Sequence, residues 1–280
     1  MTPPPAAGQQ QRTRRVVVTP AGRRRYLYLL ARHLDAQKHA FDEWHLWVNT
    51  SDAADIEYMH RLAQVRPWIR VVTVPGSDPG EGNLNIHRFF PTAADPGTSY
   101  VRLDDDVVYL DPAFLDTLFA YREAHPEPFL VYANIINNAV VSHLHQRAGL
   151  IKTALGQCGY ACMDELGWKN PLFAHDVHAS FIGDAANGRI DAWKHFGAHA
   201  LAAYERVSIN AISWLGARFA EFGGAVGRDE ELWLSVDAPR SFGTPNVIIA
   251  DAVCVHYAFH TQRDHLDATD VLARYADLAP

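Results

Sequence analysis

Short runs of β-prone residues alternate with helical patterns through the first hundred residues of the chain. Four of these runs predict strands, at Arg15–Thr19, Trp44–Val48, Ile69–Val74 and Tyr100–Leu103. The segments between them carry apolar residues at helical spacing, as Leu27, Leu30 and Leu34 do after the first strand. Strands that alternate with helices at this spacing are typical of a parallel sheet with right-handed crossovers.

The pattern is less regular in the second half of the chain. Strands are predicted there at Pro128–Ala133, Val207–Trp214, Asn246–Ala250 and Ala252–Tyr257. Val207–Trp214 alternates apolar residues with serine and asparagine, which favours a half-buried strand that joins the sheet in an antiparallel sense. We therefore expect an α/β fold with a mixed, mostly parallel central sheet flanked by helices. Its N-terminal half is expected to be Rossmann-like and its C-terminal half to hold the mixed part of the sheet.

The two ends of the chain differ in character. Met1–Thr13 is rich in proline, glutamine and alanine without periodicity, so we expect a disordered leader there. Asp267–Leu278 has the pattern of a short closing helix. Residues 14–280 are accordingly expected to form one domain.

Composition and charge narrow the class of protein. The chain has 280 residues, of which 48% are hydrophobic and 20% charged, and this is the ordinary range for a soluble globular protein. A net charge of −7 argues against a nucleic-acid partner, which requires a basic face. No apolar run reaches the roughly 18 residues of a membrane span, and the start has no signal-peptide core. We expect a cytoplasmic protein whose cysteines, Cys158, Cys162 and Cys254, are reduced and structural.

Three adjacent aspartates, Asp104–Asp106, follow directly on the fourth predicted strand. Ligands of open α/β sheets bind at the carboxyl ends of the strands, and neighbouring carboxylates repel one another unless water or a cation intervenes. Oxygen donors of this kind suit magnesium, manganese or calcium. A solvated acidic loop is the ordinary alternative, but apolar residues flank the run on both sides, which favours a functional loop. Alternation along a strand predicts that Asp104 and Asp106 point one way and Asp105 the other.

The helix after the first strand opens with Arg23, Arg24 and Arg25, although a helix N-terminus prefers negative charge. A bound phosphate would compensate, and three solvated arginines are the alternative. The turn lacks the glycine-rich fingerprint of a dinucleotide site or a P-loop, so these two classes are disfavoured.

Two further segments carry candidate chemistry. In Gly227–Glu231, Asp229 can cap a helix while Glu230 or Glu231 lies in its first turn, and both a capping and a catalytic role fit. His256 lies among apolar residues of the last strand, where it is either a satisfied core histidine or a functional one.

For other polar residues, a structural role is as consistent with the sequence as a functional one. Asn134, Asn137 and Asn138, at the end of a strand, offer hydrogen bonds to a polyhydroxylated ligand or form a turn. The histidine pairs, His143 with His145 and His175 with His178, lack an H-E-x-x-H frame, so we interpret them as surface or core residues.

Taken together, the chain from Arg15 to Arg263 resembles a GT-A-fold glycosyltransferase of the D-x-D type. The resemblance rests on the alternating strands and helices, the aspartates Asp104–Asp106 after the fourth strand, the acidic motif at Asp229–Glu231 and the late His256. It implies a divalent cation, manganese or magnesium, bound by Asp106 with Asp104 and His256. Asp105 competes with Asp106 for the principal ligand position, and Asp104 would also contact the nucleotide.

The same resemblance implies further roles. Thr19 and Asn49, at the ends of the first two strands, would line the nucleotide, and Arg24 and Arg88 would contact the diphosphate or the base. Asp229 or Glu230 would be the general base of an inverting enzyme, or would bind sugar hydroxyls in a retaining one.

The implied activity is metal-dependent transfer of a sugar from a nucleoside-diphosphate sugar to a hydroxyl of a glycan or small molecule. Residues 14–135 would bind the nucleotide sugar and residues 136–265 the acceptor.

Three alternatives remain open from the sequence. Asp104–Val108 also fits the D-x-D-x-[TV] strand end of a haloacid-dehalogenase-like phosphatase, although that motif normally lies on a first strand. A non-catalytic carbohydrate-binding protein with a structural metal would use the same aspartates. A zinc hydrolase built on the histidine pairs lacks a coherent ligand frame.

Overall fold

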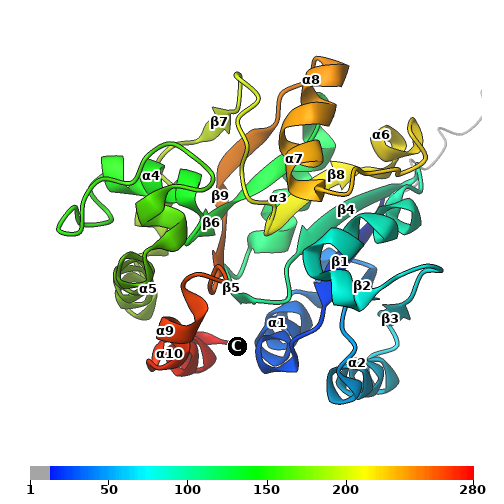
Figure 1. The fold of residues 1–280 in the computed structure, drawn as a ribbon, viewed down its shortest axis with the longest axis horizontal. Helices are drawn as coiled ribbons and strands as arrows, with labels where there is room; N and C mark the ends of the chain where they lie inside the picture. Colours follow the sequence, from blue (N-terminus) through cyan, green and yellow to red (C-terminus); the bar gives the residue numbers. More distant parts are fainter. Residues whose placement is uncertain (1–12) are drawn as a thin grey trace, which may run out of the picture.

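A computed structural model describes residues 13–280, and their strands form a mixed sheet (Figure 1). The predicted leader, Met1–Thr13, lies outside the described residues except for Thr13. The strands are β1 Arg14–Ala21, β2 Glu43–Val48, β3 Ile69–Val72, β4 Thr98–Leu103, β5 Val107–Leu110, β6 Val131–Ile136, β7 Ala198–Ala200, β8 Ala211–Leu215 and β9 Val247–His256. Their order is β3-β2-β1-β4-β8-β6-β9-β5, with β7 also paired to β9.

The direction of the strands confirms the predicted mixed, mostly parallel sheet. β1 lies between β2 and β4 and is parallel to both, and β3 extends the parallel series. β8 is antiparallel to its neighbours β4 and β6, as predicted for that segment. β9 returns to the parallel sense beside β6, and the short strands β5 and β7 pair antiparallel with its two ends.

Helices and helical turns flank this sheet. The α-helices are α1 Arg24–Ala36, α2 Ala53–Val65, α3 Phe114–Ala124, α4 Ala139–Arg147, α5 Pro171–Ala186, α6 Gly216–Ala220, α7 Glu230–Leu232, α8 Ala238–Phe242, α9 Arg263–Asp267 and α10 Val271–Leu278. Three segments of the described chain are 3₁₀-helices: η1 Lys38–Ala40, η2 Pro79–Ala93 and η4 Ile190–Trp193. Two of its segments are π-helical turns: η3 Glu165–Lys169 and η5 Trp233–Asp237. None of the helices in the described part of the chain combines the length and apolarity needed to cross a bilayer.

Burial of the sheet explains why its first strands read as continuous apolar runs. Val16, Val17 and Val18 are all fully buried, because helices cover both faces of the parallel part. The last helix returns to the first, where the guanidinium of Arg32 in α1 donates to the carbonyl oxygens of Ala276 and Ala279 (Figure 1). These contacts hold the C-terminal end of the described chain against α1.

The structure corrects several predicted boundaries. Asn246–Ala250 and Ala252–Tyr257 are one strand, β9, in which only Asp251 is exposed, so the polar residue interrupts the pattern without ending the strand. The predicted closing helix, Asp267–Leu278, begins later, at Val271 of α10, and the separate short helix α9 ends at Asp267. Asp52 caps α2, since its carboxylate accepts from the amides of Ala54 and Asp55.

Gly216→Ala tests how β4, the strand that ends in the aspartates, is placed. A Cβ at Gly216 would lie 1.9 Å from the carbonyl oxygen of Asp95, in the turn that begins β4. Overpacking against backbone should lower the free energy of unfolding by about 1–3 kcal/mol, measured by urea denaturation. Gly183→Ala is the matched control, since its Cβ would meet nothing within 4 Å and helix α5 should gain stability. Equal effects of the two substitutions would contradict this packing.

Candidate active site

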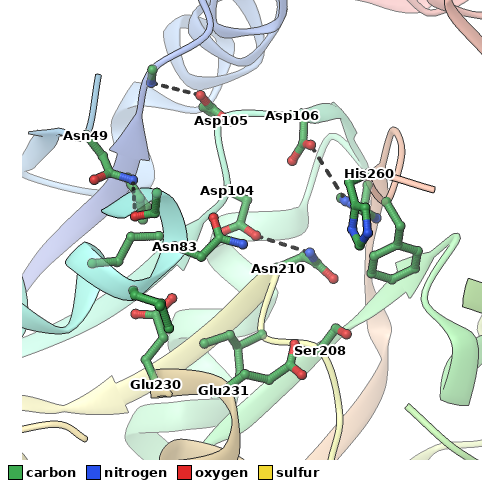
Figure 2. A pocket seen from close by; sticks show the side chains of 18 of the residues that line it. Asn49, Asn83, Asp104, Asp105, Asp106, Ser208, Asn210, Glu230, Glu231 and His260 are labelled. Carbon is green, nitrogen blue, oxygen red and sulfur yellow. Dashed lines mark hydrogen bonds and ion pairs between the residues drawn. The ribbon is translucent and has the colours of Figure 1, made fainter. Parts of the chain in front are cut away.

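A cavity of about 690 Å³ opens at the carboxyl ends of β1, β2 and β4 (Figure 2). One wall carries Gly22 and Asn49, which follow β1 and β2, together with the aspartates that follow β4. The facing walls come from residues 228–231 and from residues 256–263 at the end of β9. The sheet thus brings together side chains that are more than 200 residues apart, at the edge where α/β sheets bind ligands.

Asp104 is held in place by two neighbours. Its Oδ1 accepts from Nε and Nη2 of Arg102, at 3.0 and 2.8 Å, and its Oδ2 accepts from Nδ2 of Asn210 at 3.1 Å. Arg102 lies two residues earlier in β4 and therefore on the same face of the strand. Both carboxylate oxygens of Asp104 are thus engaged by protein donors.

Asp105 and Asp106 share the guanidinium of Arg23. Asp105 accepts from the backbone amide of Gly22 at 2.9 Å and from Arg23, while Nη1 of Arg23 lies 2.9 Å from Asp106. Nη2 of Arg263 is 3.3 Å from the same Asp106 oxygen. Residues 104–106 form a turn, so the strand-like alternation predicted for the three aspartates does not hold.

These charges set the protonation of the pair. Burial raises the pKa of Asp105, and the charge of Arg23 opposes that effect without reversing it. Burial also acts to raise the pKa of Asp106, but the charges of Arg23 and Arg263 oppose it, so that the pKa is lowered. Asp106 is therefore the carboxylate that stays ionised in the centre of the cluster.

His256 faces Asp106 because of the register of the sheet. His256 in β9 pairs with Val107 in β5, the residue after Asp106. The Nδ1 of His256 donates to the backbone oxygen of Asn137 at 3.2 Å, which fixes the tautomer, and Nε2 lies 3.7 Å from Oδ2 of Asp106. In the neutral imidazole Nε2 carries a lone pair, so two electron-pair donors face each other, an arrangement that a cation or a proton between them stabilises.

The donor set fits a divalent cation that also takes oxygens from its substrate. An imidazole nitrogen and a carboxylate oxygen suit manganese, and a hydrogen bond from the second ring nitrogen, such as that from Nδ1 of His256, is what orients a histidine that binds a metal. Among residues 13–280, no group of three or more His, Cys, Asp and Glu side chains could hold a metal ion by itself. Asp106 and His256 would then supply two ligands, and phosphate oxygens and water the others, as is usual for magnesium-type sites.

The acidic motif forms the facing wall (Figure 2). Asp229 accepts from the amide of Leu232 at 3.0 Å, which confirms its predicted cap, and pairs with Arg206. Glu230 is buried, and its Oε1 accepts from Nη1 of Arg102 at 2.8 Å. Glu231 is partly exposed to the cavity, and its Oε1 accepts from Nε of Arg206 at 2.8 Å. Arg102 therefore links Asp104 on one wall to Glu230 on the other.

The predicted nucleotide-binding residues are brought together only in part. Asn49 lines the cavity and is held by Asn85, whose Nδ2 donates to its Oδ1 at 2.7 Å. Thr19 does not line it: the side chain is fully buried and its hydroxyl accepts from Nε1 of Trp44. Arg24 pairs with Asp55 outside the cavity, and Arg88 pairs with Glu81. Thr19, Arg24 and Arg88 are thus not among the residues that line the cavity.

The arginines at the start of α1 are neutralised by the protein itself. Arg23 pairs with the strand-end aspartates, Arg24 with Asp55 and Arg25 with Asp267. Neither a bound phosphate nor solvation is needed to explain them, because carboxylates from three other segments offset the unfavourable sign at the helix N-terminus.

The cavity lining also includes charged residues that were not predicted as site residues, among them Arg23, Arg102, Arg263 and Glu231. The sequence signal for Glu231 was present in the acidic motif, and Arg23 was noted only as part of a basic run. Arg102 and Arg263 gave no local signal, since their roles depend on contacts with residues that are distant in the sequence.

Other polar residues that were considered as candidates make hydrogen bonds in the interior of the protein. Asn134 and Asn137 are fully buried and donate to backbone carbonyls, Asn134 to Trp193 and Asn137 to Tyr257. His178, also buried, lies 2.8 Å from the Tyr257 oxygen. The three cysteines, all within the described residues, are buried and free of disulfides, as predicted.

Searches against known proteins found structural likenesses. No family model and no curated protein matches the sequence. Solved structures that match include a mannosyltransferase from Pyrobaculum calidifontis in complex with GDP-Man and Mn²⁺ (15% identity, TM-score 0.46), covering 89% of this chain and 58% of that chain. A glucosyl-3-phosphoglycerate synthase from Mycobacterium tuberculosis, in complex with Mn²⁺, UDP and phosphoglyceric acid, matches with 16% identity and a TM-score of 0.49, covering 96% and 79%. A 4-diphosphocytidyl-2C-methyl-D-erythritol synthase matches with 13% identity and a TM-score of 0.46, covering 94% and 100%.

These structures include glycosyltransferases, the class that the sequence resembles.

Glu230→Gln tests the electrostatics of the facing wall. Burial raises the pKa of Glu230 to about 7 despite the opposing charge of Arg102. The folded protein therefore binds this proton more tightly than the unfolded chain, so its free energy of unfolding falls as the pH rises from about 4.5 to about 7 and is level above that. The glutamine variant lacks this pH-dependent contribution to the free energy of unfolding, which is on the order of 3 kcal/mol.

Urea denaturation of wild type and variant between pH 4.5 and 8 measures the difference. The wild type should lose stability relative to the variant over this range. Parallel curves would show that Glu230 titrates in the folded protein as it does in the unfolded chain.

Proposed function

We propose that this protein is a metal-dependent glycosyltransferase that uses a nucleoside-diphosphate sugar as donor. The observation that carries the proposal is the pair Asp106 and His256, whose donor atoms face each other 3.7 Å apart at the carboxyl edge of the sheet. This edge also carries Asn49 at the nucleotide end of the cavity and a carboxylate wall opposite. A phosphorylated ligand with a hydroxylated partner fits such a site.

The charge of the cavity supports a cation as part of the ligand. Among the described residues its lining includes six carboxylates and five guanidinium groups, which are Asp104, Asp105, Asp106, Asp229, Glu230, Glu231, Arg23, Arg102, Arg206, Arg228 and Arg263. With neutral histidines these groups leave no net positive charge even when Glu230 is protonated, and a diphosphate is not attracted to such a surface unless a cation accompanies it. When bound, the cation would act as a Lewis acid on the diphosphate leaving group.

Arg23 and Arg263 are positioned to contact the leaving group. Both flank Asp106 and both line the cavity. During transfer the bond between the anomeric carbon and the diphosphate oxygen breaks, and its electron pair stays with the diphosphate. Guanidinium groups fixed next to that oxygen stabilise the growing negative charge.

Glu231 is the general base in this proposal, rather than Asp229 or Glu230. Asp229 is used as a helix cap and an arginine partner, and Oε2 of Glu230 is shielded from solvent. The Glu231 side chain is 25% exposed at the cavity, and Arg206 holds it through one oxygen. Glu231 would accept the proton of the acceptor hydroxyl as that oxygen attacks the anomeric carbon.

The phosphatase alternative has less support. It requires Asp104 as a free nucleophile, yet Arg102 and Asn210 engage both oxygens of its carboxylate. The structural-metal alternative predicts that a cation stabilises the protein without a nucleotide. The next experiment distinguishes it from the transferase.

Asp106→Asn should abolish cation-dependent nucleotide binding. In a thermal-shift panel of UDP, GDP, ADP and CDP with and without Mn²⁺, one nucleotide should raise the Tm of the wild type only when Mn²⁺ is present. At a concentration 100-fold above Kd the stabilisation is about 2.7 kcal/mol. The variant should lose this shift, since it lacks the ionised ligand, whereas Asp251→Asn, an exposed substitution within β9, should keep it.

Two outcomes would overturn the proposal. One is an increase in Tm with Mn²⁺ alone and with no nucleotide, which favours the structural-metal protein. The other is a nucleotide shift that Asp106→Asn retains.

Glu231→Gln should slow transfer without weakening donor binding. Loss of a general base lowers kcat by about 10²–10⁴-fold. Initial rates with the nucleotide sugar identified by the panel measure the effect, and Glu57→Gln, on the exposed face of α2, is the control. A kcat within twofold of wild type would exclude Glu231 as the base.

A further inference from the structure

The cavity has an aromatic end that the proposed donor site does not use. Met163, Trp168, Phe259 and His260 line this end. The ring of His260 lies edge-on to Trp168 with centroids 5.0 Å apart, and Phe259 lies 6.2 Å from Trp168. In Figure 2, His260 lies near Asp106 and on the opposite side of the cavity from Asn49.

The charged groups next to this end are already paired. Arg206 is held by Asp229 and Glu231, and Arg263, which is close in the chain to Phe259 and His260, is held by Asp106. No unpaired positive charge among these residues is left for an anionic acceptor, so a phosphorylated or carboxylated acceptor would have to break an existing ion pair.

The hydrogen-bonding groups of the same walls are suited to hydroxyls. Oδ1 of Asn210 is buried and has no hydrogen-bond partner in the described chain, and Asn210 lines the cavity between its two walls. Asn210 is less than a tenth exposed. An unsatisfied buried acceptor costs about 1–3 kcal/mol, which a small side-chain movement toward a donor such as a ligand hydroxyl would recover.

The aromatic end is rigidly tied to the proposed metal ligand. The Thr261 hydroxyl donates to the backbone oxygen of Trp168 at 2.6 Å, and the buried Gln262 donates to that of Gly167 at 3.2 Å. Gln262 also accepts from Asn137, whose backbone oxygen receives the hydrogen bond from His256. A ligand on Trp168 is therefore held by the same framework that orients His256, as preorganised sites require.

From these contacts we propose that the acceptor is a neutral carbohydrate whose ring packs on Trp168, with His260 beside it. An aromatic face packs against the apolar face of a sugar ring, while its hydroxyls reach the acceptors of the wall. The hydroxyl that is glycosylated points toward Glu231. This inference rests on the proposed function and adds the class of acceptor to it.

Saturation-transfer NMR tests the acceptor class directly. Wild-type protein, with Mn²⁺ and the nucleoside diphosphate that shifts its Tm, is mixed with neutral p-nitrophenyl glucosides, mannosides and galactosides, and separately with 3-phosphoglycerate. At least one glycoside should show saturation of its ring protons. That signal should fall at least fivefold in Trp168→Ala and in His260→Ala, and recover in part in Trp168→Phe.

Trp68→Ala is the matched control. Trp68 is a half-buried tryptophan that packs on Trp44 and Phe41, outside the cavity, and its loss should leave glycoside binding unchanged. Far-UV circular dichroism of each variant establishes folding, and His260→Ala, an exposed substitution, decides the question if Trp168→Ala does not fold.

The outcomes separate this inference from the proposed function. A nucleotide shift in wild type without glycoside binding, binding of 3-phosphoglycerate instead, or glycoside binding that both Trp168→Ala and His260→Ala retain would overturn the acceptor assignment alone. Absence of any Mn²⁺-dependent nucleotide shift would overturn the proposed function, and the acceptor assignment with it.

Discussion

The guanidinium of Arg23 joins two buried aspartates at the point where β4 turns into β5, and the site depends on that ion-paired cluster. Asp105 and Asp106 could not both be buried as anions without it, since adjacent carboxylates repel and lose solvation. Arg23 comes from the turn after β1, and the amide of Gly22 in the same turn also binds Asp105. The first turn of the fold and its acidic loop are therefore one unit, and removing either partner would leave a buried charge unpaired.

A second buried arginine extends this arrangement across the cavity. Arg102 contacts Asp104 on one wall and Glu230 on the other, and its own burial is offset by those two carboxylates. The wall that carries Asp104 and the acidic wall thus share one electrostatic network. A change of charge at either wall is felt at the other, which suits a reaction in which negative charge develops on the leaving group while a proton is lost from the acceptor.

The sequence predicted the parallel part of the sheet because each of its strands and helices carries its own local signal. The strand around Val16–Val18, the cap at Asp229 and the strand-end aspartates were all identified in this way. β9 was divided in two because Asp251 is a polar residue inside an otherwise apolar run, and sequence periodicity does not distinguish an exposed strand residue from a turn.

The candidate site was predicted less completely, for a related reason. Asp104–Asp106 and His256 are end-of-strand residues, and strand order alone brings them together. Arg102, Arg263 and the role of Arg23 depend on pairings across 82 to 157 residues, which leave no local pattern. Thr19 was predicted to line the nucleotide because of its position at the end of the first strand. Its side chain lies in the protein interior instead, where the hydroxyl accepts a hydrogen bond from Trp44.

The central claim, that Asp106 and His256 hold a divalent cation together with a diphosphate, is tested most directly by electron spin-echo envelope modulation of Mn²⁺ bound to the protein with its nucleoside diphosphate. The account predicts coupling to a directly bonded imidazole nitrogen beside the phosphorus coupling, and loss of the nitrogen coupling alone in His256→Ala. A spectrum with protein that matches the Mn²⁺–nucleotide complex in water would contradict it.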